Sequence, residues 1–202
     1  MKIALIGASG NAGSRILAEL VSRGHQVTAI VRHPEKVAAS PLVTAIKGDV
    51  YDEVGLASLL KGHDAVISSV HFLASDAGKL IAAVRASGVK RYLIVGGAGS
   101  LEVAPGVRLI DTPQFPEIYK AEATAGAAFL DLLRTTNDLD WTFFSPAAMF
   151  VPGERTGKYR LGTDQLITHD AGSSISFEDY AVALVDEIET PKHIKARFTI
   201  GY

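Results

Sequence analysis

The sequence predicts an α/β protein built on a doubly wound parallel sheet, and three observations lead to this class. Short apolar runs rich in valine and isoleucine recur along the chain, as β-strands do. Segments whose apolar residues follow helical spacing separate these runs. The first strand and the first helix are joined by a glycine-rich turn. Because the strands alternate with helices, right-handed crossovers are expected, with parallel strands covered by helices on both faces.

The individual elements follow in a regular order. Apolar β-type runs predict strands at residues 2–6, 26–31, 42–47, 64–69, 91–95, 141–145 and 196–200. Helical spacing predicts helices from residue 15 onward and at residues 53–60, 74–87, 116–134 and 177–189. Gly24 and Gly88 are expected to close the first and third of these helices. Ser176, with two acidic residues after it, is expected to open the last one.

One glycine- and threonine-rich stretch, residues 151–175, interrupts the alternation. We expect it to form a lid or a hairpin insertion near the C-terminal edge of the sheet. No repeat, low-complexity tract or linker divides the remainder. The sequence therefore predicts a single domain over residues 1–202, with this stretch as a small C-terminal substrate or lid region.

Composition excludes several classes of function. The chain has 202 residues, of which 48% are hydrophobic and 21% charged, and its net charge is -2. No basic stripe is present, so nucleic acid is not expected as a partner. Without cysteine there are no disulfides or iron–sulfur clusters, and the histidines lack metal-site spacing, so no metal is expected. Because no signal peptide and no apolar run of membrane length is visible, we expect a cytoplasmic protein that makes no use of a membrane.

The glycine-rich turn indicates a nucleotide site. It follows the first strand and has the pattern Gly-x-x-Gly-x-x-Gly. In this context the glycines allow a tight turn and a close approach of the main chain to a pyrophosphate, which the N-terminus of the following helix attracts. Elsewhere such a pattern is often only a turn. The residues expected to contact the nucleotide here are Gly7, Ser9, Gly10, Asn11, Ala12 and Gly13.

The residue at the end of the second strand favours NADP(H). An acid at this place would hold a ribose 2′-hydroxyl, whereas an arginine accommodates a 2′-phosphate. The chain has Arg32 there, and Arg15 offers a second positive charge. NAD(H) remains the alternative. After the third strand, Asp49 and its neighbour Val50 are expected near the adenine, although an aspartate after glycine is equally typical of a turn.

These residues together resemble a known family. The glycine pattern, Arg32, the Gly48-Asp49-Val50 turn and the fourth strand are similar to those of atypical short-chain dehydrogenases/reductases. Within them the chain most resembles the NAD(P)H-binding NmrA-like group, which includes proteins labelled NADH-flavin reductases and biliverdin reductase B. Residues 140–146, 153–160 and 175–181 are similar to the same group, so the resemblance covers essentially the whole chain. It implies a Rossmann-like fold that binds NAD(P)H.

The resemblance breaks at the usual acid–base pair. Short-chain dehydrogenases generally carry Tyr-x-x-x-Lys on the helix after the fifth strand, where the tyrosine acts as general acid. Here Ala123 stands four residues after Tyr119, and Pro116 stands four residues before Lys120. A ketone or sugar substrate is therefore not expected. Hydride transfer to a flavin or quinone needs stacking and no dedicated tyrosine, so we expect such a small-molecule acceptor.

Three residues are candidates for the chemistry. Ser100 follows the fifth strand, His71 follows the fourth, and Lys120 is placed to hold the nicotinamide ribose. A turn serine, a structural histidine and a solvated lysine are the respective alternatives, and Tyr119 is expected to pack. The remaining residues expected at the cofactor are Ser69, Val70 and Pro146.

The prediction for function is thus an NAD(P)H-dependent enzyme that reduces a flavin- or quinone-like acceptor. The alternative is a regulatory protein of the NmrA type that senses NAD(P) without turnover. No heptad pattern is evident, so monomer and homodimer both stay open.

Overall fold

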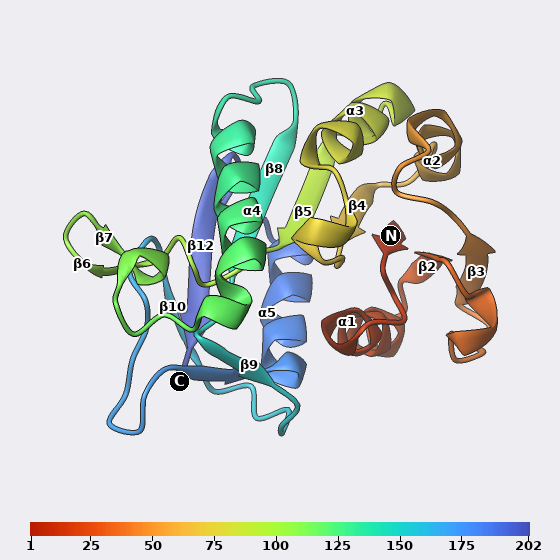
Figure 1. Cartoon of the computed structure of the whole chain (residues 1–202). Helices are drawn as coiled ribbons and strands as arrows, with labels where there is room; N and C mark the ends of the chain where they lie inside the picture. The colour runs from red at the N-terminus through yellow and green to blue at the C-terminus, as the bar shows by residue number, and fades with distance from the viewer.

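The structure, a computed structural model, describes residues 1–202 and is organised around an eight-stranded sheet (Figure 1). The strand order is β10-β12-β8-β5-β4-β1-β2-β3, and only β10 runs antiparallel to its neighbour. The strands of this sheet are β1 (Lys2–Ile6), β2 (Gln26–Val31), β3 (Val43–Lys47), β4 (Ala65–Ser68), β5 (Arg91–Val95), β8 (Asp140–Ser145), β10 (Arg160–Gly162) and β12 (Ala196–Gly201).

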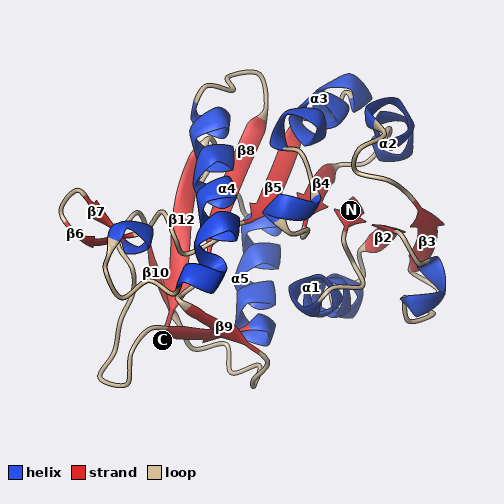
Figure 2. Cartoon of the chain, in the orientation of Figure 1, coloured by secondary structure: helices blue, strands red, loops and turns tan.

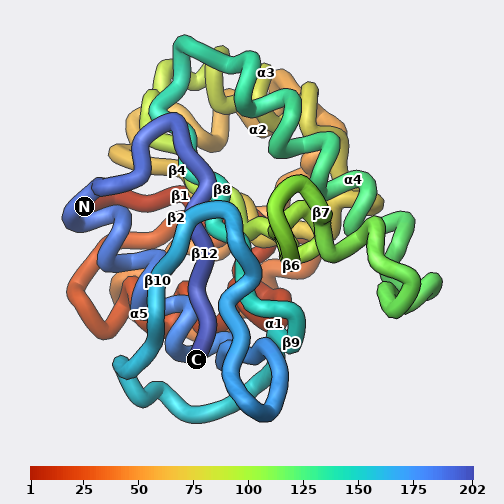
Figure 3. The backbone as a smooth tube through the Cα atoms, turned by 90° about the vertical axis from the view of Figure 1, so that its left-hand side faces the viewer, coloured from red at the N-terminus to blue at the C-terminus, as the bar shows by residue number.

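Helices cover both faces of the sheet, as Figure 2 shows. The α-helices are α1 (Asn11–Ser22), α2 (Glu53–Leu60), α3 (Ala77–Ser87), α4 (Glu117–Arg134) and α5 (Phe177–Glu189). In the turned view of Figure 3, α1 and α5 lie on one side of the strands and α2, α3 and α4 on the other. Each side has its own buried apolar cluster, of 23 and 19 residues. The doubly wound, Rossmann-like fold predicted from the sequence is confirmed.

The third helix starts later than its sequence pattern predicts. Residues 72–74 form a separate 3₁₀ turn, η2 (Phe72–Ala74), and α3 begins at Ala77. The Asp76 side chain accepts the N–H of Lys79 at 2.9 Å, which is an N-cap. The apolar residues 72–74 before Asp76 therefore form η2 and not the first turn of α3. The chain has two other 3₁₀ turns, η1 (Pro34–Lys36) and η3 (Leu109–Asp111).

Two small sheets lie outside the main one. β9 (Met149–Val151) pairs in parallel with β11 (Ser174–Ser176), and β6 (Glu102–Ala104) pairs with β7 (Val107–Arg108). The glycine- and threonine-rich stretch begins at the end of β9, supplies β10 at the edge of the main sheet, and ends in β11. None of the helices is both long and apolar enough to cross a membrane.

Residues 152–159, which we call the strap, run between β9 and β10 and are fastened to α1 and α5. Arg155 makes two hydrogen bonds to the nearly buried carboxylate of Glu19, at 2.8 and 2.9 Å. The fully buried Asp179 accepts from the Thr156 hydroxyl and the Gly157 N–H, at 2.6 and 2.7 Å. Glu178 accepts the N–H of Gly153, and Asp186 accepts the hydroxyl of Tyr159. The strap is thus held along its whole length.

Candidate functional site

The candidate site lies where the chain reverses its progress across the sheet. From β1 the chain goes outward to β2 and β3, and it then returns to β4 on the other side of β1. In open parallel sheets, ligands bind beyond the carboxyl ends of the strands at such a switch point. The glycine turn, residues 7–13, follows β1 here, and its neighbour across the switch point is the end of β4.

Two of the three glycines are required by the fold itself. Gly7 has a φ of +84°, and a Cβ added to it would lie 2.1 Å from the carbonyl oxygen of Ser69. A Cβ on Gly13 would lie 2.1 Å from the carbonyl oxygen of Gly7. A Cβ on Gly10 would meet nothing nearer than 3.4 Å. The fold therefore leaves room at Gly10 for a side chain, and the space beside it is available to a ligand.

The N-terminus of α1 presents unpaired donors beside Gly10. Gly10 is the N-cap residue and provides no side-chain cap, and the first turn carries no acidic residue. The N–H groups of Asn11, Ala12 and Gly13 have no hydrogen-bond acceptor within the protein. Together with the helix dipole, such a terminus is suited to an anionic pyrophosphate. The turn thus fits the dinucleotide predicted from its sequence.

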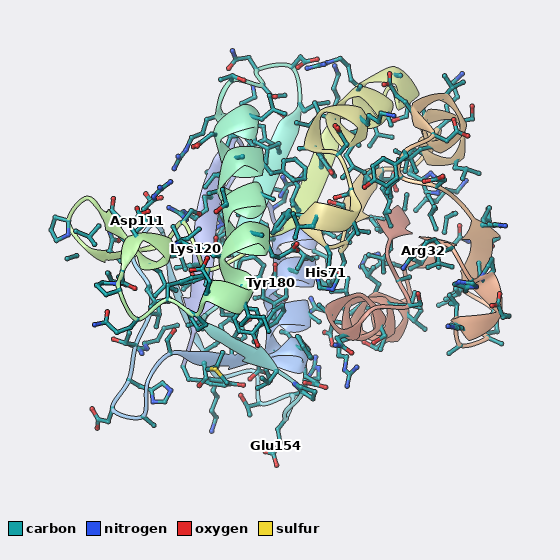
Figure 4. All side chains as sticks on the ribbon, in the orientation of Figure 1. Arg32, His71, Asp111, Lys120, Glu154 and Tyr180 are labelled. Atoms are coloured by element: carbon teal, nitrogen blue, oxygen red, sulfur yellow. The ribbon has the colours of Figure 1, made fainter.

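Arg32 and Arg15 differ in the state of their guanidinium groups. Arg32, labelled in Figure 4, follows β2 and is exposed. Its guanidinium makes no hydrogen bond or ion pair within the protein. Arg15 donates from Nε to Glu178 at 3.0 Å and lies over the ring of Phe177. The charge of Arg15 is therefore balanced within the protein, which its sequence position did not indicate. Arg32 is the free cation beside the glycine turn.

The other residues predicted at the nucleotide occupy the same edge of the sheet. Asp49, after β3, accepts the N–H of Tyr51 at 2.9 Å with one carboxylate oxygen, so it forms an aspartate turn. Val50 is half-buried and packs against the core. Ser69 and Val70 follow β4 and touch the position of the missing Cβ at Gly7. Pro146 is buried directly after β8.

Ser100 is engaged by a distant residue. Its hydroxyl accepts from Nη1 of Arg197 at 3.2 Å, and Arg197, which is nearly buried in β12, also pairs with Asp164. Ser100 keeps its own O–H to donate, since the hydroxyl acts only as an acceptor in this contact.

The first turn of α4, residues 117–120, is exposed. Tyr119 is 61% exposed and its hydroxyl has no partner, so the expectation that it packs is wrong. Lys120 lies 3.5 Å from Glu117, an exposed pair that contributes little to stability. Ala123 packs against Gly99, where a Cβ would lie 2.7 Å from that of Ala123. The place of the usual lysine is thus occupied by a close contact between α4 and the loop after β5.

His71 and the turn after it are attached to α4 by one carboxylate. Glu122 accepts from Nδ1 of His71 at 3.2 Å and from the N–H groups of Phe72 and Leu73, at 2.7 and 3.0 Å. The imidazole of His71 is 87% exposed. Glu122 did not stand out in the sequence, because a single glutamate on a helix gives no pattern.

Two other tyrosines near the middle of the sheet are unsuited to acid–base chemistry. Tyr180, on α5, is fully buried and donates to the carbonyl oxygen of Phe144 at 2.7 Å. Burial raises the pKa of Tyr180 well above its usual range. Burial likewise raises the pKa of Tyr92, whose hydroxyl contacts Ser68. Of Tyr92, Tyr119 and Tyr180, Tyr119 is therefore the one whose hydroxyl has no partner within the protein.

A hollow in the surface lies away from the carboxyl ends of the parallel strands. It is lined by residues from the C-terminal half of α5 and the loop that follows, among them Glu187, Thr190 and His193. Glu187 there pairs with Arg91, the first residue of β5. Since the first residues of parallel strands lie at the edge opposite their carboxyl ends, this hollow is separate from the glycine turn.

Comparison with known proteins agrees with this geometry. A model of the NAD(P)H-binding family matches residues 7–191. The uncharacterized protein YwnB of Bacillus subtilis is 44% identical over 99% of this chain and 98% of its own length. A structure from Bacteroides thetaiotaomicron described as a "putative epimerase" has a TM-score of 0.95 and 47% identity, covering 100% of this chain and 96% of that one. A "putative NADH-flavin reductase" from Streptococcus pneumoniae has a TM-score of 0.87 and 44% identity, covering 100% and 99%.

Proposed function

The chain belongs to the NAD(P)H-binding family, and we propose that it is an NAD(P)H-dependent reductase of a flat, flavin- or quinone-like acceptor. The observation that carries the acceptor class is the missing acid–base pair on α4. Tyr119 has no lysine four residues later, and Ala123 is pressed against Gly99 instead. A ketone or sugar would require that pair to move a proton at carbon-bound oxygen. A flat acceptor is reduced by stacking on the nicotinamide.

The arrangement at the glycine turn supports the nucleotide part of the proposal. The unpaired N–H groups of Asn11, Ala12 and Gly13 would hold the pyrophosphate, with Gly7, Ser9 and Gly10 shaping the main chain around it. The free guanidinium of Arg32 would hold the 2′-phosphate, so NADPH is favoured over NADH. Asp49 and Val50 would flank the adenine. When bound, the nicotinamide supplies the hydride.

The residues at the nicotinamide end have separate roles in this proposal. Lys120 would exchange its weak contact with Glu117 for a ribose hydroxyl. Ser100 would donate its free O–H to the nicotinamide or the acceptor while Arg197 holds the oxygen in place. His71 would face the acceptor with its exposed imidazole. Ser69, Val70 and Pro146 would form the wall on which the ring lies.

The names of relatives bear on the acceptor in opposite ways. The Streptococcus pneumoniae relative is named for flavin reduction, which agrees with the proposal. The Bacteroides thetaiotaomicron relative is named an epimerase, a reaction for which the α4 pair of this chain is lacking. The residues of this chain therefore support the first name.

Steady-state oxidation of NADPH tests the proposal directly. FMN, riboflavin and a soluble quinone are offered in turn at saturating NADPH, and NADH is compared in parallel. We expect turnover with at least one of these acceptors and a lower KM for NADPH than for NADH. Tight NADPH binding without turnover on any acceptor would contradict the reductase and point to the NAD(P)-sensing alternative, for which the structure offers no observation of its own.

A further inference from the structure

The turn that follows β4 is fixed to α4 from two directions. On one side Glu122 takes three hydrogen bonds from it, through Nδ1 of His71 and the N–H groups of Phe72 and Leu73. A carboxylate at the start of a helical turn satisfies N–H groups that otherwise lack acceptors. On the other side the ring of Phe72 lies against Gly126 of α4, where a Cβ would come within 2.7 Å of it.

The Phe72 ring also reaches the core. It stacks on Phe143 at 6.2 Å and meets Phe129 edge-on at 6.1 Å, measured between ring centres. The turn is therefore attached to α4 both by its half-buried aromatic side chain and by its N–H groups. The position of His71 follows from that of the turn.

The same contact orients the imidazole. Because Nδ1 of His71 lies 3.2 Å from Glu122, Nε2 is the ring nitrogen left free. The charged groups on the N-terminal third of α4, which packs against this turn, are Glu117, Lys120 and Glu122, and Asp76 and Lys79 lie at the start of α3, the helix that follows the turn. Of these, only Glu122 lies within ion-pair distance of the imidazole. Two residues earlier, Ser69 touches the glycine turn at Gly7, so the segment connects the nucleotide site to α4.

We propose that Glu122 is the positioning residue of the acceptor site and that it presents Nε2–H of His71 to the acceptor as the proton donor for reduction. This inference rests on the proposed function. The acceptor gains a hydride, with its electron pair, from the nicotinamide and a proton from Nε2. The N–H bond of the imidazolium breaks, an O–H or N–H bond forms on the acceptor, and water returns a proton to the exposed ring. Glu122 and His71 thereby supply the proton that a stacked flat acceptor takes up after the hydride.

Four variants test the inference. H71Q removes the proton donor, E122Q removes the charge but keeps an oxygen that accepts N–H groups, and E122A removes the attachment. D131N is the matched control, since Asp131 is an exposed carboxylate on the same helix that pairs only with Arg134. Each variant is first checked for an unchanged circular dichroism spectrum and NADPH affinity. E122Q keeps the test decisive if E122A does not fold.

The kinetic readout separates positioning from binding. Since the proposed donor must carry a proton, wild-type kcat is expected to fall as pH rises, and H71Q should abolish this dependence and lower kcat by about 10²-fold or more. E122Q should lower kcat by about 10-fold, the smaller end of the cost known for losing the carboxylate that orients a metal-bound histidine. Its KM for NADPH should not change, and D131N should match the wild type. E122Q with wild-type kcat and an unaltered pH dependence would overturn the inference.

A second readout does not depend on turnover. Amide hydrogen exchange in residues 71–75 should be faster in E122A than in the wild type, because E122A loses the acceptor of the N–H groups of Phe72 and Leu73. In D131N the exchange should not change. Equal exchange in E122A and the wild type would refute the attachment. A wild type that reduces no acceptor overturns the proposed function and the proton transfer with it, whereas an active enzyme indifferent to both His71 and Glu122 overturns only this inference.

Discussion

The glycine turn and the acceptor side of the candidate site hold their polar groups in opposite states. At the glycine turn the donors are main-chain N–H groups of α1 and the guanidinium of Arg32, and none of them has a partner. On the acceptor side the three groups proposed to act are side chains, and each already has a partner. Ser100 contacts Arg197, Lys120 contacts Glu117, and His71 contacts Glu122.

This difference indicates how each region responds to a ligand. A donor that faces only water exchanges that water for the ligand, whereas a donor paired within the protein must first give up its partner, so its net contribution is smaller. Substitutions at the glycine turn are therefore expected to have large effects on binding. Substitutions on the acceptor side are expected to act through the neighbours of the altered residue.

The largest effect is expected at Gly10. Valine there should abolish nucleotide binding and leave the fold intact, because the added Cβ meets nothing nearer than the oxygen of Gly7 at 3.4 Å while the side chain fills the ligand space. Valine at Gly13 should disrupt the turn itself, since its Cβ would lie 2.1 Å from that oxygen. Calorimetric titration with NADPH and circular dichroism distinguish the two. Undiminished affinity in Gly10→Val would mean that the pyrophosphate lies elsewhere.

Arg32 should have the next largest effect. Arg32→Ala is expected to weaken NADPH binding by roughly 1.5–3 kcal/mol, the range for a hydrogen bond to a charged group, and to affect NADH far less. Arg15→Ala is the matched comparison, and its effect should be smaller because Glu178 already balances that charge. Affinities are measured by calorimetry for both nucleotides. If the wild type bound NADPH and NADH equally, the assignment of Arg32 would be wrong.

A substitution in the strap should change the stability of the protein without altering the candidate site. Arg155→Ala should lower the free energy of unfolding by about 1 kcal/mol, or about 2–4 °C in Tm, because it removes two hydrogen bonds to Glu19. The hydrogen bonds from Arg155 hold the pKa of Glu19 below its usual value despite burial. This contribution is therefore complete above pH about 4.3, the ordinary pKa of glutamate, and is lost as pH falls through the lowered pKa.

The control for the strap is Lys158→Ala, since the Lys158 side chain makes no hydrogen bond or ion pair. Thermal unfolding of the three proteins at neutral and acidic pH provides the measurement. A gap between Arg155→Ala and the wild type that persisted in acid would show that Glu19 is not the group concerned.

The smallest effect is expected from the hydroxyl of Tyr119. Tyr119→Phe should change turnover far less than the ~10²–10⁴-fold that loss of a general acid costs. Lys120→Ala should instead raise the KM for NADPH with little change in kcat. Steady-state kinetics with the best acceptor measures both. Loss of nearly all activity in Tyr119→Phe would mean that Tyr119 acts as the general acid. It would also contradict the expectation that acceptor-side residues act through their neighbours.

The glycine turn, whose structure depends on residues close together in the sequence, could be predicted from the sequence. A strand, a glycine turn and a helix depend on neighbouring residues, so β1, the turn and α1 could be predicted from one continuous segment, residues 2–22. The acceptor side depends on contacts between residues far apart. The partner of Ser100 stands 97 residues later, and the partner of His71 stands 51 residues later. No local pattern contains such a pairing, which is also why the exposure of Tyr119 was not foreseen.

The position of α1 against α5 has a consequence for synthesis on the ribosome. The two helices share one apolar cluster, yet they lie near opposite ends of the chain, and Arg155 follows its partner Glu19 by 136 residues. At ~5–20 residues per second, the face of α1 that α5 covers stays bare for on the order of ten seconds after it is made. The apolar face of α1 thus stays uncovered until α5 emerges, and the strap, which precedes α5 in the chain, is made before that layer is complete.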